Sequence, residues 1–169
     1  MKKKIGIHWF RNDLRTIDNP SLNHLSRNYD NVLGVYIFDE VNTDPKLGSA
    51  SKVWLNHSLK YLKKQLNGNL IILKGNPEDC LDELINFFDV QEVSWNRCYE
   101  PWIIKRDKSL KIYLNEKIKV NSFNGSLLWE PWEILKNDKT PYKVFTPFYK
   151  RGCLSAASPR TPKSENINF

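Results

Sequence analysis

Short apolar runs alternate with longer segments of helical periodicity, and this alternation constrains the fold more than any other feature. Five runs rich in β-branched or aromatic residues are expected to be strands, at residues 4–10, 32–38, 70–73, 90–95 and 120–123. Several of them are almost continuously apolar, which is typical of strands covered on both faces. Repeated strand–helix units predict an α/β protein, namely a Rossmann-like three-layer α/β/α fold with a five-stranded parallel sheet and right-handed crossovers.

Helix signals fall between these runs. Asn19-Pro20 and Asn76-Pro77 each offer a capping residue followed by proline at the first helical position. The clearest stripe is Leu55, Leu59, Leu62 and Leu66, which follows a cap at Ser49 or Ser51 and ends at Asn67-Gly68. A fourth helix is expected around residues 103–118, with Leu110, Tyr113 and Leu114 facing inward.

After residue 123 the regular alternation stops. Residues 124–152 are expected to form loops with short extended or helical pieces, and the serine- and proline-containing stretch 153–169 is expected to be a flexible linker. We therefore predict one α/β domain over residues 1–152 and a linker over 153–169.

Composition excludes several classes of protein. No stretch of the 169 residues approaches the roughly 20 apolar residues that span a bilayer, and the apolar N-terminal run is too short for a secretory signal. The three cysteines form no C-x-x-C pair, and the three histidines form no metal-binding motif. We expect a cytoplasmic protein with free thiols, no membrane contact and no metal site.

The common nucleotide-binding motifs are missing. None of the seven glycines fits G-x-G-x-x-G or G-x-x-x-x-G-K-[ST], and there is no G-x-S-x-G nucleophile elbow. Because ligands of open parallel sheets bind beyond the carboxyl ends of the strands, the aromatic and polar residues found there are the candidates for a flat ligand with a polar edge. Ordinary loop-start residues are the alternative.

One of these strand ends carries a long motif. Trp9-Phe10-Arg11-Asn12-Asp13-Leu14-Arg15, followed by Asp18-Asn19, closely resembles the W-F-R-x-D-L-R-x-x-D-N opening of the DNA photolyase/cryptochrome family. Further blocks resemble the family in the same order, at residues 47–51, 95–101, 124–133 and 142–149. The resemblance covers residues 4–153, and the N-R-x-Y-E-P and L-G-S-A-S blocks are most similar to those of bacterial cyclobutane pyrimidine dimer photolyases.

The resemblance implies the antenna domain of a larger enzyme. Family members continue into a helical domain that holds FAD and the DNA lesion, so the intact protein is expected to repair UV-damaged DNA with blue light. The fragment alone is expected to be inactive and to contain no catalytic residue. The alternatives are a cryptochrome-type photoreceptor and a stand-alone α/β cofactor-binding module.

The resemblance also implies an antenna chromophore, either methenyltetrahydrofolate or a deazaflavin. Some folate-binding members carry an Asn-Glu pair where this chain has Trp102 and Ile103, which favours a pocket at the first and second strand ends. The candidate cofactor-binding residues are Trp9, Phe10, Arg11, Asp13, Phe38, Asp39, Glu40, Gly48, Ser49, Ser51, Asn96, Arg97 and Glu100. Ion pairing within the loops and simple helix capping are the structural alternatives for the charged and serine positions.

Charge and aromatic content suggest partners. The formal net charge is +7, but the basic residues of segment 97–119 are read as a solvated helix face, with DNA contact assigned to the helical domain. Aromatic rings gather in the irregular final segment, and by resemblance they pack against that helical domain. These residues are Trp129, Trp132, Phe145, Phe148 and Tyr149.

Overall fold

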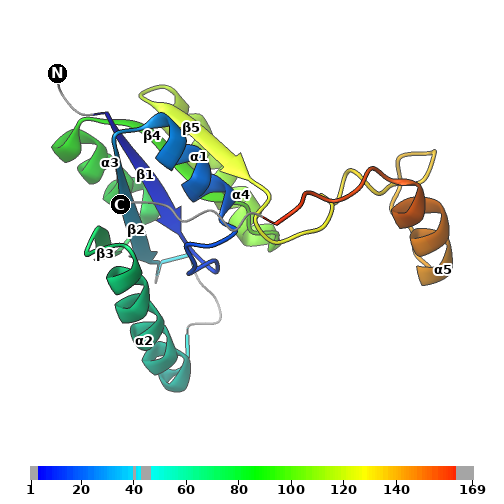
Figure 1. Ribbon diagram of the computed structural model, residues 1–169, viewed down its shortest axis with the longest axis horizontal. Coiled ribbons are helices and arrows are strands. Elements are labelled where there is room, and N and C mark those ends of the chain that lie inside the picture. The colour runs from blue at the N-terminus through cyan, green and yellow to red at the C-terminus, as the bar shows by residue number, and fades with distance from the viewer. Residues whose placement is uncertain (1–3, 40, 43–46, 163–169) are drawn as a thin grey trace. The chain divides into compact units, whose positions relative to one another are not determined.

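The computed structural model describes residues 4–39, 41–42 and 47–162 (Figure 1). The strands are β1 (Ile5–Phe10), β2 (Asn31–Phe38), β3 (Leu70–Lys74), β4 (Val90–Asn96) and β5 (Lys119–Phe123). The helices are α1 (Pro20–Asn28), α2 (Ser49–Gln65), α3 (Pro77–Phe88), α4 (Pro101–Asn115) and the short α5 (Phe145–Pro147), which continues into a π-helical turn at Phe148–Gly152 and a 3-10 turn at Cys153–Ser155.

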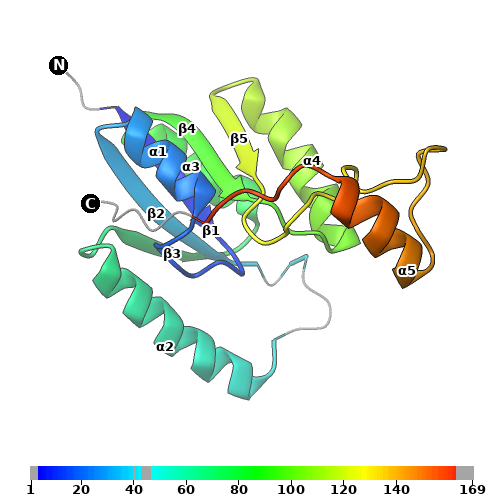
Figure 2. The ribbon, with the colours of Figure 1, turned by 45° about the vertical axis from the view of Figure 1, so that its right-hand side comes forward.

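The five strands form one parallel sheet in the order β3-β2-β1-β4-β5. The strand order reverses at β1 and β4, because the chain first builds outward through β2 and β3 and then returns to the other side of β1. This is the doubly wound arrangement, so the predicted α/β/α fold with a five-stranded parallel sheet is confirmed. Figures 1 and 2 show the strands and the helices that cover them.

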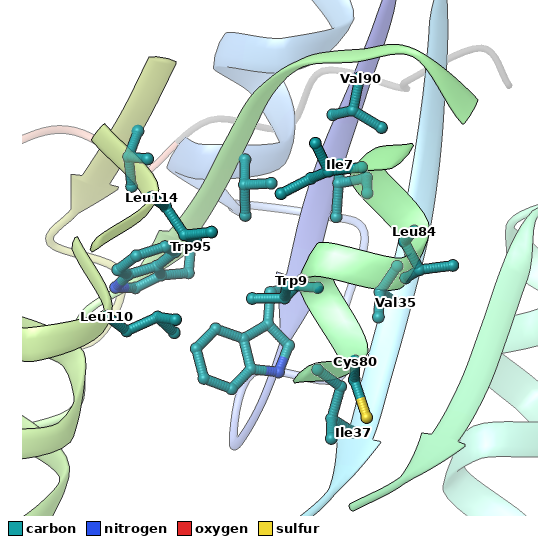
Figure 3. Packing of buried hydrophobic residues seen from close by; sticks show 14 residues of the cluster. Ile7, Trp9, Val35, Ile37, Cys80, Leu84, Val90, Trp95, Leu110 and Leu114 are labelled. Atoms are coloured by element: carbon teal, nitrogen blue, oxygen red, sulfur yellow. The ribbon is translucent and has the colours of Figure 1, made fainter. Parts of the chain in front are cut away.

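Two hydrophobic clusters lie on the two faces of the sheet. The larger one joins β1, β2 and β4 to α3 and α4, and the Trp9 and Trp95 rings meet edge to face in it, with centroids 5.6 Å apart (Figure 3). The smaller one packs Phe10 against Leu22 of α1 and Leu62 of α2. Since successive residues of a strand point to opposite faces, neighbouring Trp9 and Phe10 serve different clusters.

Helix starts follow the predicted signals in two cases. The Asn19 side chain accepts a hydrogen bond from the Leu22 N–H at 3.1 Å and caps α1, and Asn76 caps α3 in the same way. The predicted serine cap of α2 is wrong. Gly48 is its capping residue and makes no side-chain bond, because the helix already begins at Ser49.

The fourth helix also begins and ends earlier than its pattern predicted, at Pro101–Asn115 instead of 103–118. Proline has no N–H to place in a helix and its φ angle suits the first helical position, so Pro101, the last residue of the N-R-x-Y-E-P block, starts the helix. Leu110 and Leu114 are buried as expected, and Tyr113 packs at the edge of the larger cluster.

The described chain divides into two compact units, one ending at Gly125 and one formed by Ser126–Pro162. The predicted domain boundary at residue 152 stays a prediction. In the described part of the chain, each helix is too short or too polar to cross a lipid bilayer.

Candidate functional site

A cavity of about 260 Å³ lies at the carboxyl ends of β1 and β2, and we call it the first cavity. The start of α2 and the start of α4 complete its wall. Its lining consists of Trp9, Arg11, Asn12, Tyr36, Ile37, Phe38, Asp39, Leu47, Lys52, Glu100, Trp102, Ile103 and Arg106. The cavity lies outside the carboxyl ends of the strands, on the side where open α/β sheets bind ligands, and its volume lies near the lower end of small-molecule pockets.

The Arg106 guanidinium lies close to two tryptophan rings of this wall. Its Cζ atom is 4.9 Å from the centre of the Trp9 ring and 5.3 Å from that of Trp102. The Arg11 Cζ atom is also 5.0 Å from the Trp9 ring. Flat, delocalised cations are favoured against indole faces, so the tryptophan rings help to hold both guanidinium groups in the wall.

A chain of ion pairs holds both arginines in place. Arg106 Nη1 donates to Asp39 Oδ2 at 3.0 Å, and Arg106 Nη2 donates to Asp107 Oδ1 at 2.8 Å. Arg11 donates to the other oxygen of Asp107 and to the backbone carbonyl of Asn96. The network ties the ends of β1, β2 and β4 to α4 and makes the wall rigid.

Two buried N–H groups in the wall have no hydrogen-bond partner among the described residues. They are Trp9 Nε1 and Arg11 Nε. A buried donor without an acceptor costs about 1–3 kcal/mol.

Five of the predicted site residues line the first cavity: Trp9, Arg11, Phe38, Asp39 and Glu100. Phe10 lies on the opposite face of the sheet and is fully buried. Gly48, Ser49 and Ser51 form the exposed start of α2. Glu40 lies outside the described residues.

Asp13 and Asn96 fasten the loop after β1 to the end of β4. Asn96 Nδ2 donates to Asp13 Oδ2 at 2.6 Å and to Asn19 Oδ1 at 2.7 Å, and the Arg11 N–H donates to Asp13 Oδ1 at 2.9 Å. The predicted residue Arg97 donates to the Ser122 carbonyl at 2.5 Å and so joins β4 to β5.

Beneath this loop lies a buried histidine. His8 Nδ1 is 2.8 Å from Ser21 Oγ, and its Nε2 is 3.2 Å from the Asn19 amide. Burial lowers the pKa of His8 from 6.5 to about 4, while Asp13 opposes the shift and Arg11 adds to it. His8 is therefore neutral at physiological pH and acts as part of a structural hydrogen-bond network.

Sequence reasoning missed Trp102 and Arg106 as site residues, although both line the first cavity. They stand four positions apart in α4, which places them on one side of that helix. The start of a helix just after a strand end is a signal for such residues, but the basic pattern of segment 97–119 predicts a solvated face for Arg106. Among the described residues, no cluster of three or more histidine, cysteine or acidic side chains could hold a metal ion.

The fold and the cavity define a class, the doubly wound α/β domain with a ligand-sized site at its strand ends. The family model described as DNA photolyase matches residues 6–165. The chain belongs to the DNA photolyase family, which confirms the resemblance of its motifs.

Three relatives illustrate the match. A deoxyribodipyrimidine photo-lyase of Agrobacterium fabrum is 39% identical over 148 residues, covering 85% of this chain and 30% of that protein. Cryptochrome-2 of Arabidopsis thaliana is 36% identical over 162 residues, covering 91% of this chain and 26% of that protein. The crystal structure of a bacterial class III photolyase from Agrobacterium tumefaciens has a TM-score of 0.89 at 34% identity, covering 100% of this chain and 35% of that one. The chain thus spans about a third of the length of these relatives or less.

Proposed function

We propose that this chain is the N-terminal antenna domain of a deoxyribodipyrimidine photolyase. The intact protein would repair UV-induced pyrimidine dimers in DNA by blue-light-driven electron transfer from FAD bound in a helical domain. The family match and the 39% identity to a named photo-lyase support this function. The single observation that carries the antenna role is the first cavity, because it joins aromatic walls to a polar edge at the strand ends.

The residues present fit a flat chromophore of the methenyltetrahydrofolate or deazaflavin type. Trp102 and Phe38 offer ring faces, and Asp39 and Arg106 offer an acceptor and donors at the ring edge. The unpartnered Trp9 N–H supplies one more donor. When bound, such a chromophore would absorb near-ultraviolet or blue light and pass the excitation to the flavin.

The protein's own part in this role is to bind, orient and shield. The ion pairs of Asp39 and Asp107 with Arg106 fix one wall of the first cavity before a ligand arrives, and preorganised walls lose little entropy on binding. The aromatic rings exclude water from one side of the site. None of these residues needs to change its protonation state for light absorption.

We further propose that the aromatic residues of the second unit pack against the helical domain. Trp132 is 60% exposed and Phe145 is 73% exposed, and the rings of Phe145 and Tyr149 stack with centroids 5.8 Å apart. Exposed apolar clusters of this kind mark interaction surfaces. On this view residues 1–152 form the antenna domain and 153–169 lead into the next domain.

The test uses the product of the complete reading frame with reduced FAD bound. Under blue light it should convert dimer-containing oligonucleotides to intact pyrimidines, and in darkness it should not. Loss of an absorption band from a bound pterin or deazaflavin in a Trp102→Ala variant would support the antenna role. A flavin-loaded protein that leaves dimers intact would refute the repair function.

A cryptochrome-type photoreceptor is the second candidate. The 36% identity to Cryptochrome-2 of Arabidopsis thaliana over 91% of this chain favours it. The same α/β domain would then serve signalling, and the distinguishing residues lie in the helical part. The repair assay separates the two, since a photoreceptor of this kind would show flavin photoreduction without dimer splitting.

A further inference from the structure

Trp102 and Arg106 border two cavities and not one. A second cavity of about 440 Å³ shares these two side chains with the first cavity and continues between the starts of α3 and α4. Its other lining includes Asn76, Glu78, Lys105 and Ser109. Both cavities belong to the compact unit that ends at Gly125, so the arrangement is internal to one folded body.

The two cavities differ in chemistry. The first cavity has the rings of Phe38 and Trp102 in its wall, whereas the second cavity places Asn76, Lys105 and Ser109 beside the apolar side chains of Pro77 and Leu110. A molecule that filled both would carry a flat ring at one end and a polar chain at the other. Trp102, which borders both, would lie beside the link between the two parts.

The charges around the second cavity favour a ligand with an anionic tail. The Arg106 guanidinium is already paired with Asp39 and Asp107. The Lys105 ammonium makes no ion pair or hydrogen bond with any residue that the structure describes, and it lines the second cavity. A cation without an ion-pair partner at the wall of a cavity attracts an anionic group more strongly than a neutral one.

We propose that the ligand of the first cavity extends past Trp102 and Arg106 into the second cavity, where Lys105 binds an anionic group on the tail of the ligand. The ligand class is a flat-ring cofactor with a phosphate- or carboxylate-bearing tail. This inference rests on the proposed antenna function and deepens it. Glu78 lines the same cavity and works against an anion there, so Lys105 and Glu78 have opposite effects on affinity.

The test measures binding of probe pairs that share a ring and differ in tail charge. The first pair is riboflavin and flavin mononucleotide, and the second is methenyltetrahydrofolate with one and with three glutamates. Dissociation constants are measured for the 169-residue chain by fluorescence titration at low salt. The more anionic member of whichever pair binds should bind about threefold to fivefold tighter, the size expected of a partly exposed ion pair.

Variants give the sharper readout. Lys105→Gln should abolish the preference for the anionic member, and Glu78→Gln should increase it. Lys108→Gln is the matched control, because Lys108 is an exposed lysine of the same helix outside the lining of the second cavity. Rising salt should erase the preference in the unaltered chain.

Two kinds of failure are distinguishable. Equal affinity for both members of a pair, or an equal loss for both members in Lys105→Gln, would overturn the tail site and leave the ring site intact. Absence of binding for all four probes would contradict the proposed antenna function itself, and the tail site with it.

Discussion

Asp39 and Arg106 form an ion pair that joins the end of β2 to α4, with Arg106 Nη1 3.0 Å from Asp39 Oδ2. The same carboxylate accepts hydrogen bonds from the backbone N–H groups of Val41 at 3.1 Å and Asn42 at 2.9 Å. One buried side chain therefore shapes the turn after β2 and also anchors the helix that closes the first cavity.

Breaking this pair should destabilise the chain. Asp39→Asn and Arg106→Gln should each lower the free energy of unfolding by about 3 kcal/mol, because each removes one partner of a mostly buried ion pair. Asp107 stays as the second partner of Arg106 in Asp39→Asn. The double variant should lose less than the sum of the two, with a coupling energy of about 1–2 kcal/mol. Urea unfolding of the four proteins measures all three quantities, and strict additivity would show that the pair contributes nothing to stability.

His8 should make stability depend on pH in a defined window. The unfolded histidine takes up a proton below about pH 6.5, whereas the buried side chain has a pKa of about 4. The unfolded state therefore binds more protons between these values, and the free energy of unfolding falls as the pH drops from 6.5 to 4. The full loss is on the order of 3 kcal/mol.

The measurement compares urea unfolding at several pH values in the unaltered chain and in His8→Gln, which should have a flatter profile. If the variant does not fold, NMR titration of the unaltered chain gives the same information. Movement of the His8 ring resonances near pH 6.5 would contradict the prediction.

Glu92 should control the titration of Tyr29. Glu92 is fully buried in β4 and accepts a hydrogen bond from the Tyr29 hydroxyl at 2.8 Å. Burial and then the hydrogen bond and charge of Glu92 raise the pKa of Tyr29 to about 12. Glu92→Gln removes the charge, so the pKa of Tyr29 should fall toward its ordinary value of 10.

Tyrosinate absorbance at high pH measures this change, with Tyr29→Phe as the control that identifies the signal. Glu92→Gln should also lower the free energy of unfolding by about 2 kcal/mol, since hydrogen bonds to the buried charge weaken. Burial alone would raise the pKa of Glu92, but hydrogen bonds from Asn121 and Tyr29 and the nearby His24 outweigh it and hold the pKa below its ordinary value. Its stabilising contribution should thus be present above pH 4.5 and be lost as the pH falls further.

Replacing Trp9 should mainly lower the free energy of unfolding, whereas replacing Trp102 should mainly weaken ligand binding. Trp9 is 1% exposed and packs in the larger core cluster, so Trp9→Ala should lower the free energy of unfolding by about 4 kcal/mol. Trp102 is only partly buried at the cavity wall, so Trp102→Ala should change stability by less than about 1 kcal/mol and weaken ring-ligand binding instead. Urea unfolding and fluorescence titration separate the two effects, and unchanged ligand affinity in Trp102→Ala would argue against a ring site at this wall.

The exposed rings of the second unit should bind apolar dyes. Anilinonaphthalene sulfonate should fluoresce with the native 169-residue chain, and Trp132→Ser with Phe145→Ser should reduce the signal strongly. Phe87→Ser is the matched control, because Phe87 is 79% exposed but lies on α3 in the other unit. If Phe87→Ser reduced the dye fluorescence more than Trp132→Ser with Phe145→Ser does, the dye-binding apolar surface would lie on α3 and not on the second unit.

Local patterns predicted most of the architecture because they depend on neighbouring residues. The Asn19-Pro20 and Asn76-Pro77 signals gave two helix starts correctly, since capping is satisfied within one turn. The serine cap of α2 failed because a glycine can occupy the capping position when the helix begins one residue further on. The W-F-R-x-D-L-R block was also enough to predict the family.

The order of apolar runs and helix signals along the chain was enough to predict the strand–helix alternation, the parallel sheet and the candidate residues at strand ends. Which of those residues share a cavity depends on how the helices pack on the sheet. Asp13 and Asn96 are hydrogen-bonded to each other and do not line the first cavity. Trp102 and Arg106 of α4 do line it. The reason is that a contact such as Asp39–Arg106, 67 positions apart, depends on how α4 crosses the sheet, and no local pattern encodes that crossing.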